Sequence, residues 1–377
     1  MGRRVKFYIR LLPPVVLLLL CVFGFSSSAV DLKNDNNSLQ NAMEGEAKDI
    51  LDEFLSILPS DIREGAAEGD LNNSIGISVL FSEIVSAVTE NGSKIGSFFL
   101  LSLGVLFLLA VLSMVNKQSA GASRIGSLAA SLLLYGELMP LISEMGGAIE
   151  ALNTFFGGAA GVLTSLLLAS GEVNRAAVQT AGMNLTLSLF SCFGSEFLGT
   201  LAAAFFSVGI VSGVGGRGYR ALAKGIRSAF FWGAGVLSTL LVGLIALQGF
   251  IASSSDSVAL RAAKYAASGM IPIVGGTVSG ALSTLFSGLS YAKGIIGGAS
   301  VACIIAIALS PLVLLLCYRF VISAVLLIID FLPDGAGGEC FSGLASSLDA
   351  LIAVYSLTGV IYILEILMFV RGGSTVF

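Results

Sequence analysis

The 377-residue chain contains no histidine, and only 12% of its residues are charged. Without histidine there is no imidazole zinc site, no Ser-His-Asp triad and no thiol-imidazole pair. The five cysteines have neither the spacing of a disulfide framework nor that of a metal site. The sequence also lacks paired acids for acid-base chemistry, so we expect a protein that is not an enzyme and uses no cofactor or metal.

Nucleotide-binding signatures are missing as well. GVGGRG at 213–218 has the glycine spacing of the dinucleotide fingerprint, but it follows an apolar run rather than a strand. No acid lies about twenty residues further on, as that fingerprint requires. The chain has no Walker A sequence either. We therefore expect neither ATP hydrolysis by this chain nor a nucleic-acid partner.

Apolar residues, in contrast, make up 55% of the chain, and 46 residues are glycine, a composition typical of a protein dissolved in lipid. Residues 1–29 have a basic start, an apolar stretch from Leu11 to Phe25 and a small-residue end, which predicts a signal peptide cleaved after Ala29. An uncleaved anchor helix is the alternative, although Pro13 and Pro14 interrupt its short apolar stretch.

Residues 30–94 form an acidic segment that we expect on the extracytosolic side. Thirteen acids against four bases give residues 31–94 a net charge of −9. Apolar residues at helical spacing predict one amphipathic helix from a Ser38 cap to Pro59 and a second from Ile77 to Asn91. Their apolar faces either pack on each other or on the membrane domain, or they provide a docking surface for a partner protein.

Residues 95–377 carry the apolar runs of an all-α, polytopic helical membrane protein. The runs occur at 95–116, 125–143, 155–169, 181–214, 228–252, 294–332 and 350–370. The 181–214 run is too long for one span, so we expect a hairpin with Glu196 at its tip; a buried intramembrane acid is the alternative. Pro311 and Arg319 predict a division of 294–332. We expect eight or nine crossings, some of them short or re-entrant.

Basic residues predict the orientation of these crossings, because lysine and arginine accumulate in cytosolic loops. This rule puts three groups on the cytosolic side: Lys117 with Arg124, Arg217 to Arg227, and Arg371. The same rule places the following on the outer side: Glu144, Glu150, residues 253–293, Asp334 and Glu339. A weak similarity between 155–183 and 230–270 raises the possibility of an inverted internal repeat, with chance as the alternative.

Residues 253–293 hold the candidate site, since polar residues and helix breakers gather there between two apolar runs. We expect a helix over 256–268, a break at Pro272 and a short helix over 277–289, forming a broken or re-entrant pair. Three interpretations stay open: a surface loop, a pore-lining or gating hairpin, and a solute-binding site. The candidate contacts are Asp256, Arg261, Lys264, Pro272, Gly275, Gly276 and Lys293.

GxxxG pairs allow close helix approach and are weak signals in a glycine-rich chain. The predicted helix-packing positions are Gly209 with Gly213, Gly276 with Gly280, and Gly294 with Gly298.

The stretch from Leu244 to Leu285, followed by AKGIIGGASVACIIAIALSPLV from Ala292, resembles the stage III sporulation protein AE family of endospore-forming bacteria. Most of the resemblance lies in Gln248-Gly249, Asp256, Arg261 to Lys264, and IPIVGG at 271–276. It implies a subunit of the channel complex between mother cell and forespore, located in the mother-cell membrane. The family offers no catalytic residues to transfer to this chain.

The resemblance also implies partners. The acidic outer segment is expected to meet ring-forming subunits, and the basic cytosolic loops to meet a secretion-type ATPase or other membrane subunits within the lipid bilayer. In this interpretation the chain is a permeation path or an assembly platform. The alternative is a stand-alone secondary transporter of a small anionic or zwitterionic solute, with Asp256, Arg261 and Lys264 as its contacts.

Overall fold

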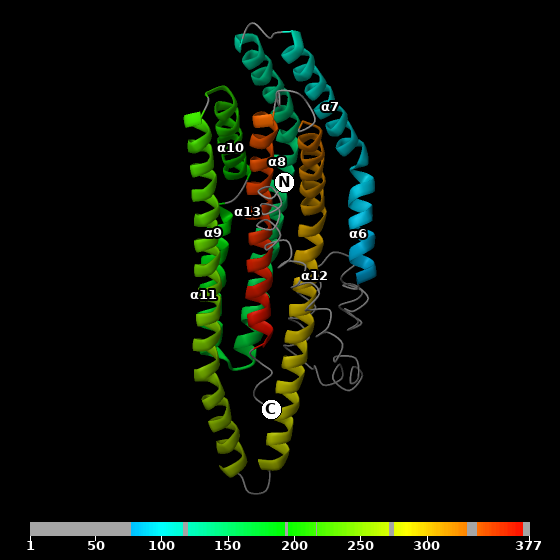
Figure 1. The fold of residues 1–377 in the computed structure, drawn as a ribbon. Helices are drawn as coiled ribbons and strands as arrows, with labels where there is room; N and C mark the ends of the chain where they lie inside the picture. The colour runs from blue at the N-terminus through cyan, green and yellow to red at the C-terminus, as the bar shows by residue number, and fades with distance from the viewer. Residues whose placement is uncertain are drawn as a thin grey trace.

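The computed structural model describes residues 77–115, 120–192, 195–215, 217–270, 275–329 and 338–371. Its helices are α6 (Ile77–Glu90), α7 (Gly92–Val115), α8 (Ala120–Ala169), α9 (Val173–Ser191), α10 (Ser195–Gly215), α11 (Arg217–Met270), α12 (Gly275–Ile329) and α13 (Gly338–Arg371). They lie along one long axis (Figure 1). The all-α prediction is confirmed for this part of the chain. The expected signal peptide and the helix expected from Ser38 lie outside the described residues.

Five of these helices are long and apolar enough to cross a membrane. The apolar stretches are Gly92–Leu112, Leu132–Ala169, Ala221–Gly249, Ala292–Ile329 and Cys340–Val370, and a shorter apolar helix covers Phe197–Val208. The described helices are therefore those of a helical membrane protein. The cleaved signal peptide and the eight or nine crossings are not confirmed and stay predictions.

Three helices are much longer than a bilayer requires. α8, α11 and α12 contain 50, 54 and 55 residues, which at about 1.5 Å per residue exceeds the roughly 30 Å of a hydrocarbon core. The expected division of 294–332 is wrong, because α12 continues through Pro311 and Arg319. Leu312, Leu314 and Leu315 are buried directly after this proline. Packing by neighbouring helices stabilises a helix that proline alone would interrupt.

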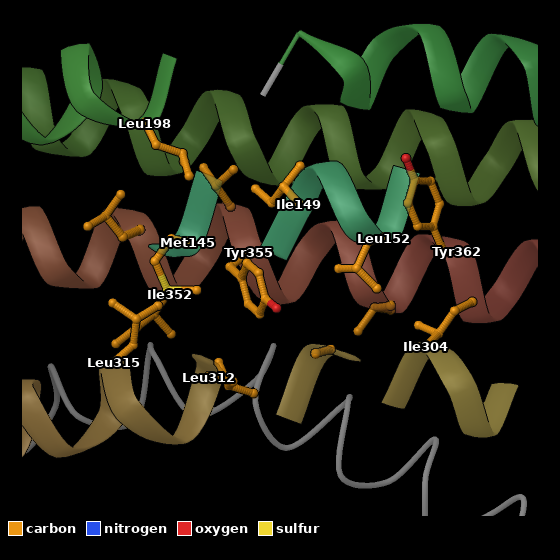
Figure 2. Packing of buried hydrophobic residues seen from close by; sticks show 14 of the residues in the cluster. Met145, Ile149, Leu152, Leu198, Ile304, Leu312, Leu315, Ile352, Tyr355 and Tyr362 are labelled. Carbon is orange, nitrogen blue, oxygen red and sulfur yellow. The ribbon is translucent and has the colours of Figure 1, made fainter. Parts of the chain in front are cut away.

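α13 is the central helix of the bundle and packs between α8 and α12. In Figure 2, Ile352 and Tyr355 of α13 lie between Met145 and Ile149 of α8 on one side and Leu315 of α12 on the other. Two tyrosines on α13 anchor their hydroxyl groups in this core. Tyr355 donates to the Ile307 carbonyl at 3.4 Å, and Tyr362 donates to the Asn153 side chain at 2.5 Å.

α9 and α10 form one interrupted passage antiparallel to α8. Going along the chain from α9 to α10, the contacts with α8 move steadily back toward its start: Thr180 with Thr164, Leu187 with Gly157, Phe190 with Asn153, Gly199 with Ile142 and Phe206 with Tyr135. The break after Ser191 agrees with the predicted interruption. The predicted hairpin is wrong, because both helices run in the same direction, and Glu196 lies beside an interruption rather than at a tip.

α11 and α12 form a long hairpin that extends beyond the rest of the bundle. We call residues 250–270 of α11 and 275–291 of α12 the arm. Figure 1 shows the arm projecting past the α8–α9 turn and the end of α13. The break around Pro272 agrees with the prediction, although this proline itself lies outside the described residues. The expected separate helices over 256–268 and 277–289 are instead the ends of α11 and α12.

The two ends of the bundle carry different junctions. The α7–α8, α10–α11 and α12–α13 junctions lie at one end, which we call the junction end, and the arm lies at the other (Figure 1). Arg124 and Arg217 therefore share an end, as predicted. Glu339 shares it too, and Arg371 lies toward the arm end, so the expected sides of these two residues are wrong. These two residues exchange ends because α12 passes along the bundle once, whereas the sequence predicted two crossings for residues 294–332.

Further sequence expectations concern α8, and the structure changes them. Glu144 and Glu150 are exposed residues inside the apolar stretch of α8 and do not lie in an outer loop. Residues 155–183 contain the α8–α9 turn, whereas 230–270 lie wholly within α11, so these two stretches are not a structural repeat.

α6 confirms the second predicted amphipathic helix and shows where its apolar face packs. Ala87 and Ile84 contact Leu309 and Val313, near the middle of the apolar part of α12. The inner face of α6 therefore packs on the membrane domain, which is one of the two interpretations given for this helix.

Candidate functional site

The turn between α8 and α9 places a carboxylate inside the bundle. Gly171 has φ 74°, a left-handed conformation that favours glycine. The Glu172 N–H donates to the Leu167 carbonyl at 3.0 Å and the Gly171 N–H to the Leu168 carbonyl at 2.9 Å. These two bonds are the Schellman motif that ends α8. The chain then reverses at Glu172, the residue that precedes α9.

Glu172 holds two basic residues, and we call these three side chains the Glu172 cluster. Lys293 of α12 donates to its Oε1 at 2.5 Å, and Arg175 of α9 donates to its Oε2 at 3.0 Å. Arg175 also donates to the carbonyls of Met368 and Phe369 at 3.1 and 3.0 Å, near the end of α13. The cluster thus connects α9, α12 and α13 at the base of the arm.

A second group, the Asp349 cluster, lies nearer the junction end. Asp349 of α13 is fully buried, with 0% exposure. It accepts hydrogen bonds from Arg227 of α11 at 2.7 Å and from Arg319 of α12 at 2.6 Å. Arg227 also donates to Ser346 at 2.9 Å. This carboxylate therefore connects three helices in the same way as Glu172 does.

Between the two clusters, polar side chains line the inner face of α9 where it meets α11 and α13. Thr186 donates to Oε1 of Glu365 at 2.9 Å. The amide of Gln248 lies directly against α9, because a Cβ on Gly182 would collide with it. Gln179 lies one helical turn before Gly182 and is also buried. We call Gln179, Thr186, Gln248 and Glu365 the polar seam.

The polar seam has unsatisfied hydrogen-bonding capacity. Oε2 of Glu365, Oε1 of Gln248, and both Oε1 and Nε2 of Gln179 are buried without a hydrogen-bond partner. Most buried polar atoms in proteins are paired, so each of these requires an explanation such as a bound ion or water. Ionisable residues inside membrane helices are rare and commonly mark polar pathways.

The structure describes only one of the predicted contact side chains, Lys293. It is buried, with 2% exposure, and is paired with Glu172 rather than exposed in a pore. Asp256, Arg261 and Lys264 lie on the arm. They are beyond Gly249, the last residue of α11 before the arm, which packs against Met368. The side chains of these three residues lie outside the described part of the structure.

The remaining predicted residues occupy helix positions without described contacts. Gly275 and Gly276 begin α12, and Glu196 lies in the first turn of α10. Gly209 and Gly213 lie in α10, and Gly280 and Gly298 lie in α12. At Gly294 an added Cβ would meet no atom within 4 Å, whereas at Gly297 it would collide with Val370. The close approach of α12 to α13 is therefore at Gly297.

Sequence reasoning missed central residues of the two clusters and of the polar seam: Glu172, Arg175, Gln179, Asp349 and Glu365. Glu365 lies inside an apolar run, and an acid in such a run is the signal that would have identified it. Glu172 and Arg175 lie between two runs and read as an ordinary loop, because only the Gly171 turn brings them inward.

Comparisons with known proteins give one consistent result. The profile of the family described as stage III sporulation protein AE matches residues 56–373. A curated relative from Bacillus subtilis (strain 168), named stage III sporulation protein AE, is 24% identical over 345 residues, which cover 86% of this chain and 84% of the relative. No solved structure matches. Because the match covers most of the chain, this membrane-type helical protein belongs to the stage III sporulation protein AE family.

Proposed function

We propose that this protein is a non-catalytic membrane subunit of the channel complex connecting mother cell and forespore. It acts there as a permeation path or an assembly platform in the mother-cell membrane. The observation that carries the proposal is the family match over residues 56–373, which includes all five apolar stretches. Ring-forming subunits and a secretion-type ATPase are the proposed partners.

The shape of the bundle supports the platform role. The arm extends beyond the bundle at the end opposite Arg124 and Arg217. By the positive-inside rule the junction end is cytosolic, so the arm faces the space between the two membranes. Its α11 side, residues 250–270, has a length of roughly 30 Å at about 1.5 Å per residue. An arm of this length suits contact with ring-forming subunits.

Purification of the tagged protein from sporulating cells tests this proposal. We expect mass spectrometry of the material in mild detergent to recover ring proteins and the ATPase in stoichiometric amounts. A variant in which a short Gly-Ser turn replaces residues 254–290 is expected to lose the ring proteins and keep the cytosolic partners. Recovery of the protein alone, under conditions that preserve other membrane complexes, would contradict the proposal.

A stand-alone secondary transporter of a small solute is the second candidate, and the polar seam favours it. The seam gives the bundle interior polar groups that packing alone does not require. Solute uptake by the purified protein in vesicles, without any partner, would support this candidate. A strict requirement for partner subunits would argue against it.

A further inference from the structure

We propose that the polar seam binds a monovalent cation together with water. This site is distinct from the Glu172 and Asp349 clusters, and it does not depend on assembly with other subunits. Its residues come from three helices: Gln179 and Thr186 from α9, Gln248 from α11 and Glu365 from α13.

The positions on α9 bring the seam residues together. Gly182 and Thr186 are four residues apart on one helix face, where neighbouring Cβ positions are about 5–6 Å apart. Gln248 lies over Gly182, and Glu365 is bonded to Thr186. The Gln248 amide and the Glu365 carboxyl therefore lie over adjacent turns of α9. Gln179 lies one turn before Gly182, toward the start of α9.

The unsatisfied atoms indicate what binds there. Three of them are oxygens, on Gln179, Gln248 and Glu365, and the only nitrogen is the amide of Gln179. Hard cations prefer carboxylate and carbonyl oxygens, and water satisfies an amide N–H. The Glu365 carboxyl is fully buried, and its one described hydrogen bond comes from a neutral hydroxyl. A buried carboxylate that keeps its charge is paired with a compensating positive charge.

The charges nearby restrict the ligand to a monovalent cation. In the Glu172 cluster, both Arg175 and Lys293 direct their described ionic contacts to Glu172. Glu365 supplies one negative charge, and the other seam groups are neutral. Among the described residues, no group of three or more His, Cys, Asp or Glu side chains gathers to hold a metal ion. One carboxylate among neutral oxygens leaves a single negative charge, which a cation of single charge balances.

Thermal stability of the purified full-length protein tests the site. Unfolding is followed in sodium, potassium or N-methylglucamine chloride of equal ionic strength, with a thiol dye that reports exposure of the buried Cys303 and Cys340. We expect sodium or potassium to raise the Tm by about 2 °C or more relative to N-methylglucamine, because a ligand that binds the native state stabilises it. Equal Tm values in all three salts would overturn the proposal.

Two variants assign the effect to Glu365. Glu365→Gln retains an oxygen that accepts the Thr186 hydrogen bond but removes the charge, so we expect it to abolish the difference between salts. Glu150→Gln, which changes an exposed acid on α8, is the matched control and should retain the difference. A salt difference that persists in Glu365→Gln would place the cation elsewhere and overturn the proposal.

Cysteine accessibility tests the same site if Glu365→Gln does not fold. In a chain without its native cysteines, we expect a small water-soluble thiol reagent to label Gln248→Cys, and sodium or potassium to slow the labelling. Leu198→Cys, in the apolar core of Figure 2, is the control and should stay unlabelled. Failure to label Gln248→Cys, or a labelling rate that is the same with and without sodium or potassium, would contradict the proposal. Both assays use the protein without partners, so failure of the proposed channel function leaves their result unaffected.

Discussion

At the scale of single residues, two carboxylates organise the charged interior of this protein. Glu172 and Asp349 each hold two basic side chains, and each connects α12 to other helices. Breaking a buried ion pair by removing one partner is strongly destabilising, because charge stays behind in the interior. The two clusters therefore hold α9, α11, α12 and α13 together.

Asp349→Ala is expected to destabilise the protein by about 3–5 kcal/mol, because it removes the carboxylate shared by two guanidinium groups. The thermal assay with a thiol dye measures this loss. Glu144→Ala is the control, since its exposed pair with Lys94 is 4.0 Å long. It should change stability by less than about 1 kcal/mol. Equal effects of both changes would show that the Asp349 cluster does not hold the helices together.

Glu172 and Lys293 should be energetically coupled across α9 and α12. The Lys293→Met change leaves Glu172 with one base fewer, and Glu172→Gln removes the charge that Lys293 contacts at 2.5 Å. We expect the double variant to lose less stability than the sum of the single losses, by about 1–3 kcal/mol. A double-mutant cycle of unfolding free energies measures this difference. Strictly additive losses would contradict the coupling.

At the scale of elements, the interrupted α9–α10 passage explains why one α8 helix can pack against both. The side chain of Phe190 near the end of α9 and that of Leu198 in α10 are both buried. Asn153 of α8 donates to the Phe190 carbonyl at 3.4 Å, close to the interruption. The last carbonyls of a helix lack partners within the helix itself, so those inside a bundle are paired with other groups. The break is therefore a supported feature of the fold rather than a surface turn.

Crosslinking distinguishes this passage from a hairpin. In a chain without native cysteines, a short bifunctional thiol reagent should link Gly157→Cys with Leu187→Cys, because an added Cβ at Gly157 lies 3.4 Å from the Leu187 side chain. Leu189→Cys with Leu201→Cys should give no crosslink, although a hairpin centred on residue 195 would place them opposite each other. Efficient crosslinking of that second pair would contradict the collinear passage.

Elements differ in how far the sequence predicts them. The helical class, the α6 helix and the breaks near Ser191 and Pro272 follow from composition, periodicity and local helix breakers. The continuity of α12 through Pro311 and the direction of α10 do not, because neighbouring helices decide them. In the candidate site, Lys293 was predicted, but its partner Glu172 was not, because the two residues are 121 positions apart.

At the scale of the whole molecule, the bundle has two chemically different ends. Arg124, Arg217 and Lys224 lie at the junction end, where three helix connections meet. The arm and the end of α13 lie at the other. A single direction of insertion therefore gives the protein a basic face on one side of the membrane and a projecting hairpin on the other. In the channel complex proposed above, the two ends would meet different partners.

Thiol accessibility in intact and in permeabilised cells that express the protein without sporulating tests this orientation. In a chain without native cysteines, an impermeant reagent should label Gly275→Cys, at the start of α12, from outside the membrane. Lys224→Cys is exposed in the structure and should be labelled only after permeabilisation. Gly338→Cys, at the start of α13, is the informative third position. It should behave like Lys224→Cys if α12 makes a single passage, whereas a division of α12 into two crossings would make it behave like Gly275→Cys.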